Sequence, residues 1–482
     1  MKKLISLVLA LVMVISMFAA CSNSAEEETP KVEETKATAA AENSGKAEAP
    51  VEENADPYGW ILHEDPASVT GTVQFYIPFK GSQGMDAMIA DFNKTYPNVE
   101  VVLNTYNNNS DGNLTVNTAI QAGEVDVLAS FGLSNTYKRW EAAMFYDLTD
   151  LCEEYGIDLV ENWSTDDYTY DGSIYTFPCG GLSYYICINM DAWNEAGLGA
   201  LPTEWTWDEY LAACEAMTEY NADGSVAVYG GSDYHSVNYW TYTSAQLDGL
   251  DPYYEADGTC SFDTDHFKKA LQREYDAEVV NKIWFPKATY RGDNLQTQQI
   301  FLQDQLANSA INPNMVRYMS DRENYGTDWK VGFAPWPVEE AGQTNYMSGV
   351  APFSHAGICT DDSDEDFEAC WAWLRWYSTY GVKYLVAAGH QPNWTGTEAG
   401  AALDLLFGSE DEAAKYLDVE SFNRVVGVAT NPAYIEKNLV AYSDVDALLK
   451  EYTMYVLDDQ MTVEDALTEA AALANEAIDA AK

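Results

Sequence analysis

Strand and helix patterns alternate along residues 71–129, and this alternation limits the fold more than any other feature of the chain. Residues 71–77 alternate apolar and polar side chains, which predicts a strand. Met85, Met88, Ile89 and Phe92 then follow at helical spacing. A second strand is expected at 99–103, a helix at 113–121 and a short buried strand at 125–129. Such alternation predicts a parallel, doubly wound sheet, so the expected fold class is α/β.

Two loops of this expected sheet are candidates for contact with a ligand. They are 78–84, after the first strand, and the polar loop 130–135, after the third. In open α/β sheets ligands bind at the carboxyl ends of the strands. We therefore expect both loops to face one crevice.

Local motifs extend the α/β pattern to the end of the chain. Asp171-Gly172 predicts a hairpin turn, because both residues tolerate a positive φ. Three Ser/Thr-x-x-Asp/Glu boxes predict helix starts, at Thr206, Ser363 and Thr462. No repeat of fixed period is present.

The N-terminus has the composition of an export signal. Two lysines precede an apolar run over 4–20, and residues 1–20 are expected to be a signal peptide. Cys21 follows two alanines, as in the bacterial lipobox, and would carry the lipid. The alternative is a plain signal peptide with Cys21 an incidental thiol. Residues 21–57 are expected to be a disordered acidic linker, which predicts an exported protein anchored by lipid to the outer face of the membrane.

Cysteine and histidine are too scattered to suggest a metal or a disulfide framework. Seven cysteines follow Cys21, at wide spacing, and no C-x-x-C occurs. We expect free buried thiols and no cofactor. The acidic run 361–366 lacks the spacing of a calcium loop, so we expect its carboxylates at a helix N-terminus instead.

The charge balance excludes several partners. The chain has 25 Lys and Arg against 77 Asp and Glu, a formal net charge of −52. Nucleic acids and anionic lipid surfaces need a basic face, so neither is expected as a partner. The acidity favours a neutral solute. Aromatic residues make up 13% of the chain, which suits a protein that uses flat apolar faces.

Seven local motifs, in order, resemble the family 1 extracellular solute-binding proteins of ABC importers. They are Phe92–Val99, Ala119–Val127, Tyr170–Pro178, Ile188–Asp191, Leu201–Glu209, the Ser348–Val350 block with the acidic turn that follows, and Thr462–Leu467. Val125 stands where the family usually has proline. The resemblance covers nearly all of 69–482.

The resemblance implies a periplasmic-binding-protein-like fold with two lobes, each a sheet flanked by helices, that close on a ligand about a hinge. The first lobe would be 58–182 plus 345–400 and the second 187–335 plus 401–482. Residues 183–187 and 336–344 would be the hinge crossovers. The partners would be a sugar and the permease subunits in the membrane, and the protein would be a monomer.

The resemblance and the chemistry of sugar binding together give twelve candidate ligand residues. Sugars need planar hydrogen-bonding groups and aromatic faces. The candidates are Lys80, Ser82, Gln83, Phe131, Asn135, Tyr185, Tyr239, Trp240, Asn314, Trp336, Gly349 and Trp394.

Five of these candidates also have a purely structural interpretation. Trp240 could pack under its loop, and Trp394 could be a lid over a helix end. Tyr185 and Trp336 could be hinge packing, and Lys80 a solvated loop charge. Asn314 stands where the family often has an aromatic platform, which puts a platform there in doubt.

No catalytic motif of a hydrolase or NTPase occurs, so an enzyme is not expected. The prediction is the substrate-binding subunit of an ABC transporter that captures a carbohydrate, specifically an oligosaccharide, and delivers it to a membrane permease. Two alternatives remain open, a glycan-acting hydrolase and a surface adhesin without transport.

Overall fold

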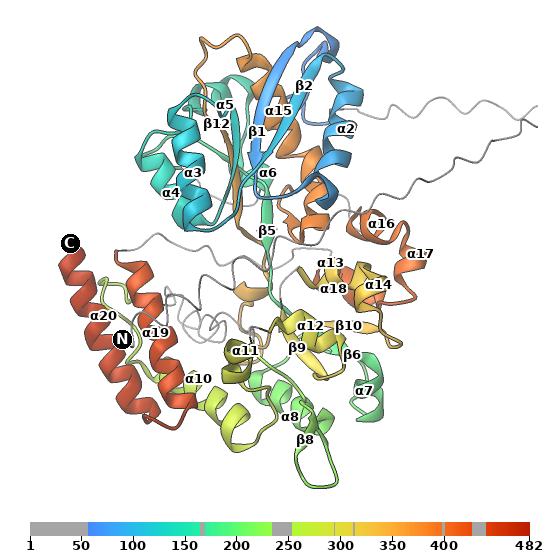
Figure 1. Ribbon diagram of the computed structural model, residues 1–482, viewed down its shortest axis with the longest axis vertical. Helices are drawn as coiled ribbons and strands as arrows, with labels where there is room; N and C mark the ends of the chain where they lie inside the picture. The colour runs from blue at the N-terminus through green and yellow to red at the C-terminus, as the bar shows by residue number, and fades with distance from the viewer. Residues whose placement is uncertain are drawn as a thin grey trace, which may run out of the picture. The chain divides into compact units, whose positions relative to one another are not determined.

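Two separate hydrophobic cores organise the computed structural model (Figure 1). The structure describes residues 56–163, 169–233, 253–293, 295–311, 314–397, 401–426 and 440–482. The first core draws its buried residues from 60–179 and 356–394. The second core draws them from 185–347 and 403–478. Each core therefore contains two stretches that are far apart in sequence.

The first core is built on a five-stranded sheet of order β2-β1-β3-β12-β4. β1, β2 and β3 run parallel, whereas β12 is antiparallel to both β3 and β4. The prediction of a parallel sheet is confirmed for β1, β2 and β3. It is wrong for β12, which lies antiparallel between β3 and β4. The strands are β1 Gly71–Ile77, β2 Val99–Thr105, β3 Val127–Phe131, β4 Phe177–Pro178 and β12 Ser354–Ile358.

Helices cover the first-core sheet, with α3 and α4 to one side and α2 and α15 to the other (Figure 1). Their order along the chain matches the sequence pattern from α2 to α4. They are α2 Met85–Thr95, α3 Ser110–Gln121, α4 Leu133–Glu141, α5 Thr149–Tyr155, α6 Leu159–Trp163, α15 Phe367–Tyr377 and the 3-10 helix η5 Tyr380–Ala388. The expected loop 130–135 is wrong in detail, because Ser130 and Phe131 end β3 and Asn135 lies in the first turn of α4.

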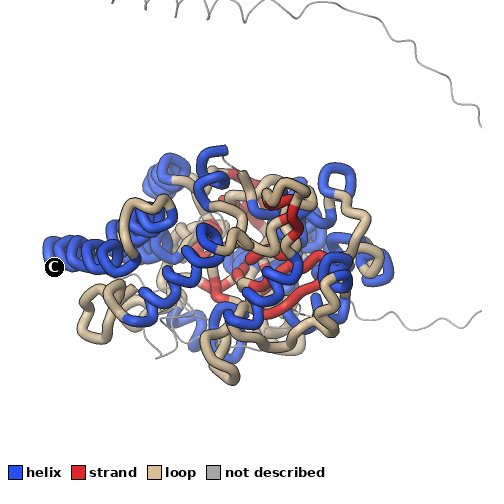
Figure 2. The backbone as a smooth tube through the Cα atoms, turned by 90° about the horizontal axis from the view of Figure 1, so that it is seen from below, coloured by secondary structure: helices blue, strands red, loops and turns tan. Residues whose placement is uncertain are grey.

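The second core has a smaller, antiparallel sheet of order β10-β6-β9. Its strands are β6 Tyr185–Asn189, β9 Asn308–Ile311 and β10 Val331–Pro335, with a separate hairpin of β7 Glu219–Tyr220 and β8 Val226–Val228. The helices before the sheet closes are α7 Met190–Glu195, α8 Trp207–Met217, α10 Asp265–Tyr275, the π-helix η3 Asp276–Val280, α11 Lys287–Asp293, α12 Thr297–Leu302, α13 Asn314–Ser320 and α14 Arg322–Tyr325. The later helices are α16 Ala401–Phe407, α17 Glu410–Ala413, α18 Val419–Val425, α19 Tyr442–Leu457 and α20 Val463–Ala481. Helices surround the strands in the second view (Figure 2).

A third small sheet joins the two cores. Its order is β11-β5-β13, with β5 at Gly180–Leu182, β11 at Ala351–Pro352 and β13 at Gln391–Pro392. The chain passes between the cores at β5 and at β11, and β13 shortly precedes a third passage, between Trp394 of the first core and Leu403 of the second. Trp336 and Val338, which lie in the expected crossover 336–344, are fully buried in or beside the second core, and the crossover itself stays a prediction.

The local signals of the sequence agree with the structure at most helix starts and turns. The Thr206 side chain accepts the N–H of Glu209, and Thr462 accepts that of Asp465. The Asp171-Gly172 turn has positive φ at both residues, 51° and 86°. The box at Ser363 is wrong, because α15 starts at Phe367 after Asp366.

A buried cluster of charges lies inside the second core. The Lys287 ammonium is 2.9 Å from the Asp233 carboxylate and 2.6 Å from that of Glu274. The Glu278 carboxylate accepts the backbone N–H of Lys287 at 2.9 Å. Burial, followed by repulsion from Glu274, raises the pKa of Glu278 to about 8. The cluster therefore holds three carboxyl groups around one buried ammonium.

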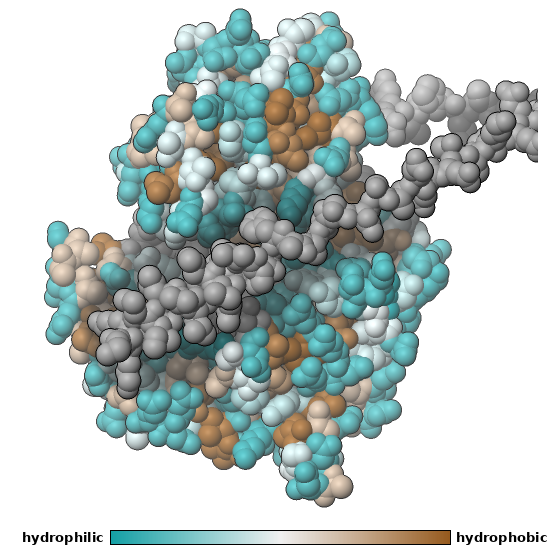
Figure 3. All heavy atoms as spheres, in the orientation of Figure 1, coloured by the Kyte–Doolittle hydropathy of each residue, from teal (hydrophilic) through white to brown (hydrophobic). Residues whose placement is uncertain are grey.

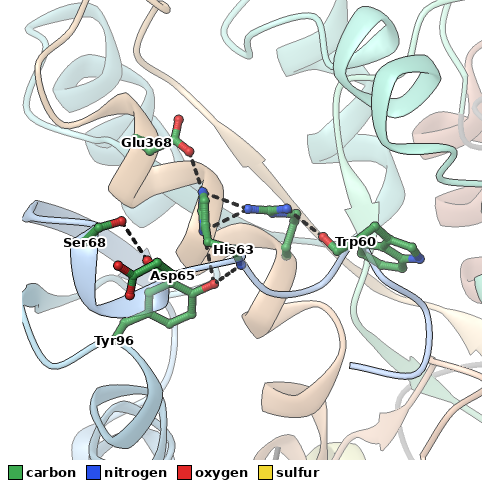
Figure 4. A network of polar contacts seen from close by, with 7 residues as sticks. Trp60, His63, Asp65, Ser68, Tyr96 and Glu368 are labelled. Carbon is green, nitrogen blue, oxygen red and sulfur yellow. Dashed lines mark hydrogen bonds and ion pairs between the residues drawn. The ribbon is translucent and has the colours of Figure 1, made fainter. Parts of the chain in front are cut away.

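The first described residues are fastened to the first core by a polar network, which we call the N-terminal clasp (residues 56–69; Figure 4). Buried Arg375 donates to the carbonyl oxygen of Trp60 at 2.6 Å and contacts the His63 ring at 3.0 Å. His63 also bonds to Glu368 and to the Tyr96 hydroxyl. Since Arg375 is fully buried, breaking this network would strand its charge away from water.

Seven cysteines in the described part of the chain are free thiols. All but Cys359 are buried, and burial raises the pKa of Cys214 to about 11. The expectation of free buried thiols agrees with this placement. No helix within the described ranges is both long enough and apolar enough to cross a bilayer.

Candidate functional site

The candidate site lies where β1 and β3 end and β12 begins, at one edge of the first-core sheet. β12 starts beside the end of β3, because Ser354 pairs with Phe131 in antiparallel register. Phe79 and Lys80 follow the end of β1 after Pro78. The carboxyl-end edge that the sequence predicted as the ligand side is therefore formed by three strands rather than two.

Four rings form a cluster at this edge, which we call the Phe79 cluster (Phe79, Phe131, Phe353 and His390). Phe79 lies 4.9 Å from Phe131 and 5.3 Å from His390, between ring centroids. Phe353 stacks on His390 at 5.7 Å with an interplanar angle of 14°. Phe131 and His390 are buried, whereas Phe79 and Phe353 are half-buried. The cluster thus leaves part of two phenyl rings exposed at this edge of the sheet.

His390 stays neutral in this setting. Burial, and then the nearby Arg317 guanidinium, lower its pKa to about 3. Its Nδ1 atom has no hydrogen-bond partner among the described residues. The cluster therefore adds a neutral polar atom, and no carboxylate, to the aromatic surface.

Polar candidates on the two predicted loops lie next to the cluster. Lys80 and Ser82 are exposed, and the Gln83 side chain accepts the Lys80 backbone N–H at 2.9 Å. Half-buried Asn135 donates to the Phe131 carbonyl oxygen at 3.1 Å. The structure brings these four residues to the same edge, as the loop argument expected.

The candidate residues around the connecting sheet are more deeply buried. Tyr185 is fully buried in β6 against Phe333, and Trp336 is fully buried against Trp207. Gly349 is buried at the end of the 3-10 helix η4 (Tyr346–Ser348). In this structure both rings take the packing position that was the alternative to ligand contact.

Trp394 and Asn314 belong to different cores, Trp394 to the first and Asn314, through α13, to the second. Trp394 is 6% exposed and packs between Tyr58 of the clasp and Tyr380 of η5. Half-buried Asn314 starts α13 and lies against Gly389. Tyr239, Trp240 and Cys21 lie outside the described residues, so they stay predictions.

Sequence reasoning missed Phe79, Phe353 and His390. Phe79 directly precedes Lys80, so its place at the end of a strand was a usable signal. Phe353 gave no local signal, because its position follows from the pairing of β12 with β3 across more than 200 residues of chain. His390 was not among the candidates, although Trp394, four residues later, was.

The acidic turn 361–366 is used for backbone contacts. Asp361 accepts the Ser363 N–H at 2.9 Å, and Asp366 accepts the Thr72 N–H at 3.0 Å. Within the part of the chain that the structure describes, no group of three or more His, Cys, Asp or Glu residues is arranged to hold a metal ion. The turn connects the start of α15 to β1.

Comparison with solved structures identifies the same architecture. A sugar transporter protein from Rhizobium etli, in an open conformation, has a TM-score of 0.69 and 16% identity, over 86% of this chain and 100% of that one. An ABC substrate-binding protein from Listeria monocytogenes, in complex with cycloalternan, has a TM-score of 0.61 and 18% identity, over 85% and 99%. Maltose-bound MalE3 of T. maritima has a TM-score of 0.60 and 19% identity, over 83% and 98%. At these identities the likeness shows a periplasmic-binding-protein-like α/β fold.

Sequence comparison gives the family. No curated protein matches the chain. The family model described as bacterial extracellular solute-binding protein matches residues 78–384, more than half of the chain. The resemblance expected from seven short motifs is confirmed, and the chain belongs to the bacterial extracellular solute-binding proteins.

Proposed function

We propose that this protein is the lipid-anchored, carbohydrate-binding subunit of an ABC importer, with the two cores acting as lobes that close on the ligand. The single observation that carries the proposal is the Phe79 cluster at the carboxyl-end edge of the first-core sheet. Half-buried phenyl rings offer the flat apolar faces against which a sugar ring packs its C–H groups. The family consists of binding receptors and not of enzymes.

Hydrogen-bonding groups beside these rings suit a neutral polyhydroxyl ligand. Lys80, Ser82 and Asn135 supply ammonium, hydroxyl and amide groups within one or two turns of the cluster. His390, whose pKa is lowered to about 3 by burial, stays uncharged at any physiological pH. The chain's net charge of −52 repels anionic solutes at long range.

The connecting sheet is the hinge in this proposal. β5 and β11 carry two passages between the cores and β13 shortly precedes the third, and short strands can absorb a rotation at their ends. The lobes would comprise 58–182 plus 345–400 and 187–335 plus 401–482. Tyr239, Trp240 and Asn314 would supply the wall that the second lobe turns toward the Phe79 cluster.

Similar proteins support a sugar as the ligand. The Listeria protein is described with bound cycloalternan and the T. maritima protein with bound maltose. Delivery to a membrane permease would follow closure, with Cys21 carrying the lipid. Replacement of Cys21 by serine should move the protein from the membrane fraction to the soluble exported fraction.

A thermal-shift screen over mono- and oligosaccharides tests the binding function. A ligand that binds only the folded state at 100 times its dissociation constant adds about 2.7 kcal/mol to the free energy of unfolding. Phe79→Ala should lose most of the shift that the wild type shows. Phe367→Ala is the matched control, because Phe367 is also half-buried in the first core but follows the opposite end of β12.

The outcomes separate binding from other activities. A saturable shift that Phe79→Ala removes and Phe367→Ala retains supports the proposal. Cleavage of labelled oligosaccharides during the incubation, or no shift with any glycan while a non-sugar solute gives one, would overturn it.

A further inference from the structure

Residues 389–391, which end η5 and begin β13, touch both cores. Gly389 has a φ of 87°, and a Cβ there would come within 2.1 Å of the Asn314 Oδ1 atom in the second core. His390 belongs to the Phe79 cluster of the first core. Gln391 pairs with Gly181 in the connecting sheet. Three consecutive residues therefore join the first core, the connecting sheet and the second core.

The Gln391 side chain makes the most specific of these contacts. It is 6% exposed. Its Oε1 accepts the hydroxyl of Ser183, and its Nε2 donates to the Val426 carbonyl oxygen, each at 2.6 Å. Ser183 directly follows β5, whereas Val426 caps α18 and belongs to the second core. One planar amide thus links the connecting sheet to the second core.

The two bonds respond differently to a rotation of the cores. Ser183 directly follows β5 and Gln391 lies in the neighbouring strand β13 of the same sheet, so their bond can survive a rotation. Val426 moves with the second core, so a rotation about the sheet changes the distance from Gln391 Nε2 to the Val426 oxygen. Because the amide is buried, losing this partner leaves a donor and an acceptor away from water.

We propose that Gln391 is a positioning residue that sets the equilibrium between lobe arrangements through its bond to Val426, and thereby sets ligand affinity without touching the ligand. This inference rests on the proposed function, in which the two cores are the moving lobes. Any residue that stabilises one arrangement changes the apparent affinity for every ligand by the same factor.

Small-angle scattering of the ligand-free protein tests the inference without knowledge of the sugar. Gln391→Met keeps the side-chain length and removes both bonds, and Gln391→Glu keeps the acceptor for Ser183 while removing the donor to Val426. Both should shift the ratio of the two arrangements by about threefold to tenfold, the effect of one buried hydrogen bond. The shift appears as a changed radius of gyration and a broader distance distribution.

Ser183→Ala is the matched control. It removes the Ser183 bond from the same amide and leaves the bond to Val426. We expect it to lower the melting temperature but to leave the scattering profile unchanged. Hydrogen exchange of peptides within 419–426 should be faster in both Gln391 variants and unchanged in Ser183→Ala.

The result that overturns the inference is a pair of folded Gln391 variants that melt earlier but scatter and exchange as the wild type does. A Ser183→Ala variant whose scattering profile changes as much as that of the Gln391 variants would also overturn the inference, because the effect would then not depend on the bond to Val426. Absence of any glycan binding refutes the proposed function alone. Where glycans do bind, Gln391→Met should change all their dissociation constants by one common factor.

Discussion

Glu278 provides a test of how a buried carboxyl group limits the stability of this protein. It is 8% exposed, its pKa is raised to about 8 by burial and by Glu274, and it accepts the Lys287 N–H at 2.9 Å. Between pH 4.5 and 8 the folded state holds a proton on Glu278 that the unfolded state releases. The free energy of unfolding therefore falls as the pH rises through this window, and this group adds no further change above pH 8.

Glu278→Gln removes the titration and keeps an oxygen for the Lys287 N–H. A pKa moved from 4.5 to about 8 corresponds to at most about 5 kcal/mol of unfolding free energy. Lys287 attracts the ionised form and Glu274 titrates in the same range, so we expect about 2–4 kcal/mol. Relative to wild type, the variant should be nearly equal at pH 5 and more stable by this amount at pH 9.

Urea denaturation at pH 5, 7 and 9 measures the difference. Glu464→Gln is the matched control, since the Glu464 side chain is 68% exposed and pairs with Lys268 at the surface. The control should follow the wild type at every pH. A Glu278→Gln protein that is no more stable than wild type at pH 9 would show that Glu278 is ionised and well paired in the folded state, and the reasoning would be refuted.

Three further predictions concern other parts of the molecule. Arg375→Met should lower the free energy of unfolding by about 2–4 kcal/mol and expose residues 56–69 to limited proteolysis, because the clasp loses its buried donor; unchanged digestion would contradict the clasp. Trp240→Ala, like Phe79→Ala, should weaken glycan binding by about 1–3 kcal/mol in calorimetry with the melting temperature of the free protein nearly unchanged; unaltered affinity would remove that residue from the site. Thiol titration should find at most Cys359 reactive in the native protein and all seven thiols after unfolding, since the other six are buried; fewer after unfolding would indicate disulfides.

Features that depend on neighbouring residues were predictable from the sequence. The helix starts at Thr206 and Thr462 and the Asp171-Gly172 turn each need only four residues of chain, and each formed as expected. β1, α2 and β2 likewise follow from the spacing of their apolar side chains. The hydrophobic pattern also placed Lys80 and Asn135 at one edge of the first-core sheet.

Features that depend on pairing across the chain were not predictable. The antiparallel pairing of β12 with β3 brings Phe353 to the candidate site, and no local pattern in the sequence predicts this pairing. The resemblance placed Trp336 at a hinge crossover, and only the folded chain shows that it packs against Trp207. The charge cluster around Lys287 joins residues from three separate segments, and only the folded chain shows that they meet.

Most side chains on the face seen in Figure 3 are hydrophilic, as the composition requires.

The N-terminal clasp makes the two cores unequal in how they would carry a pulling force. Because Arg375 and Trp60 fasten the clasp to the first core, a force that arrives along the chain from the N-terminus is borne by the first core alone. A protein held at a membrane through that end would keep one half stationary relative to its attachment. The other half would be free to rotate, and its rotation would not move the attachment point.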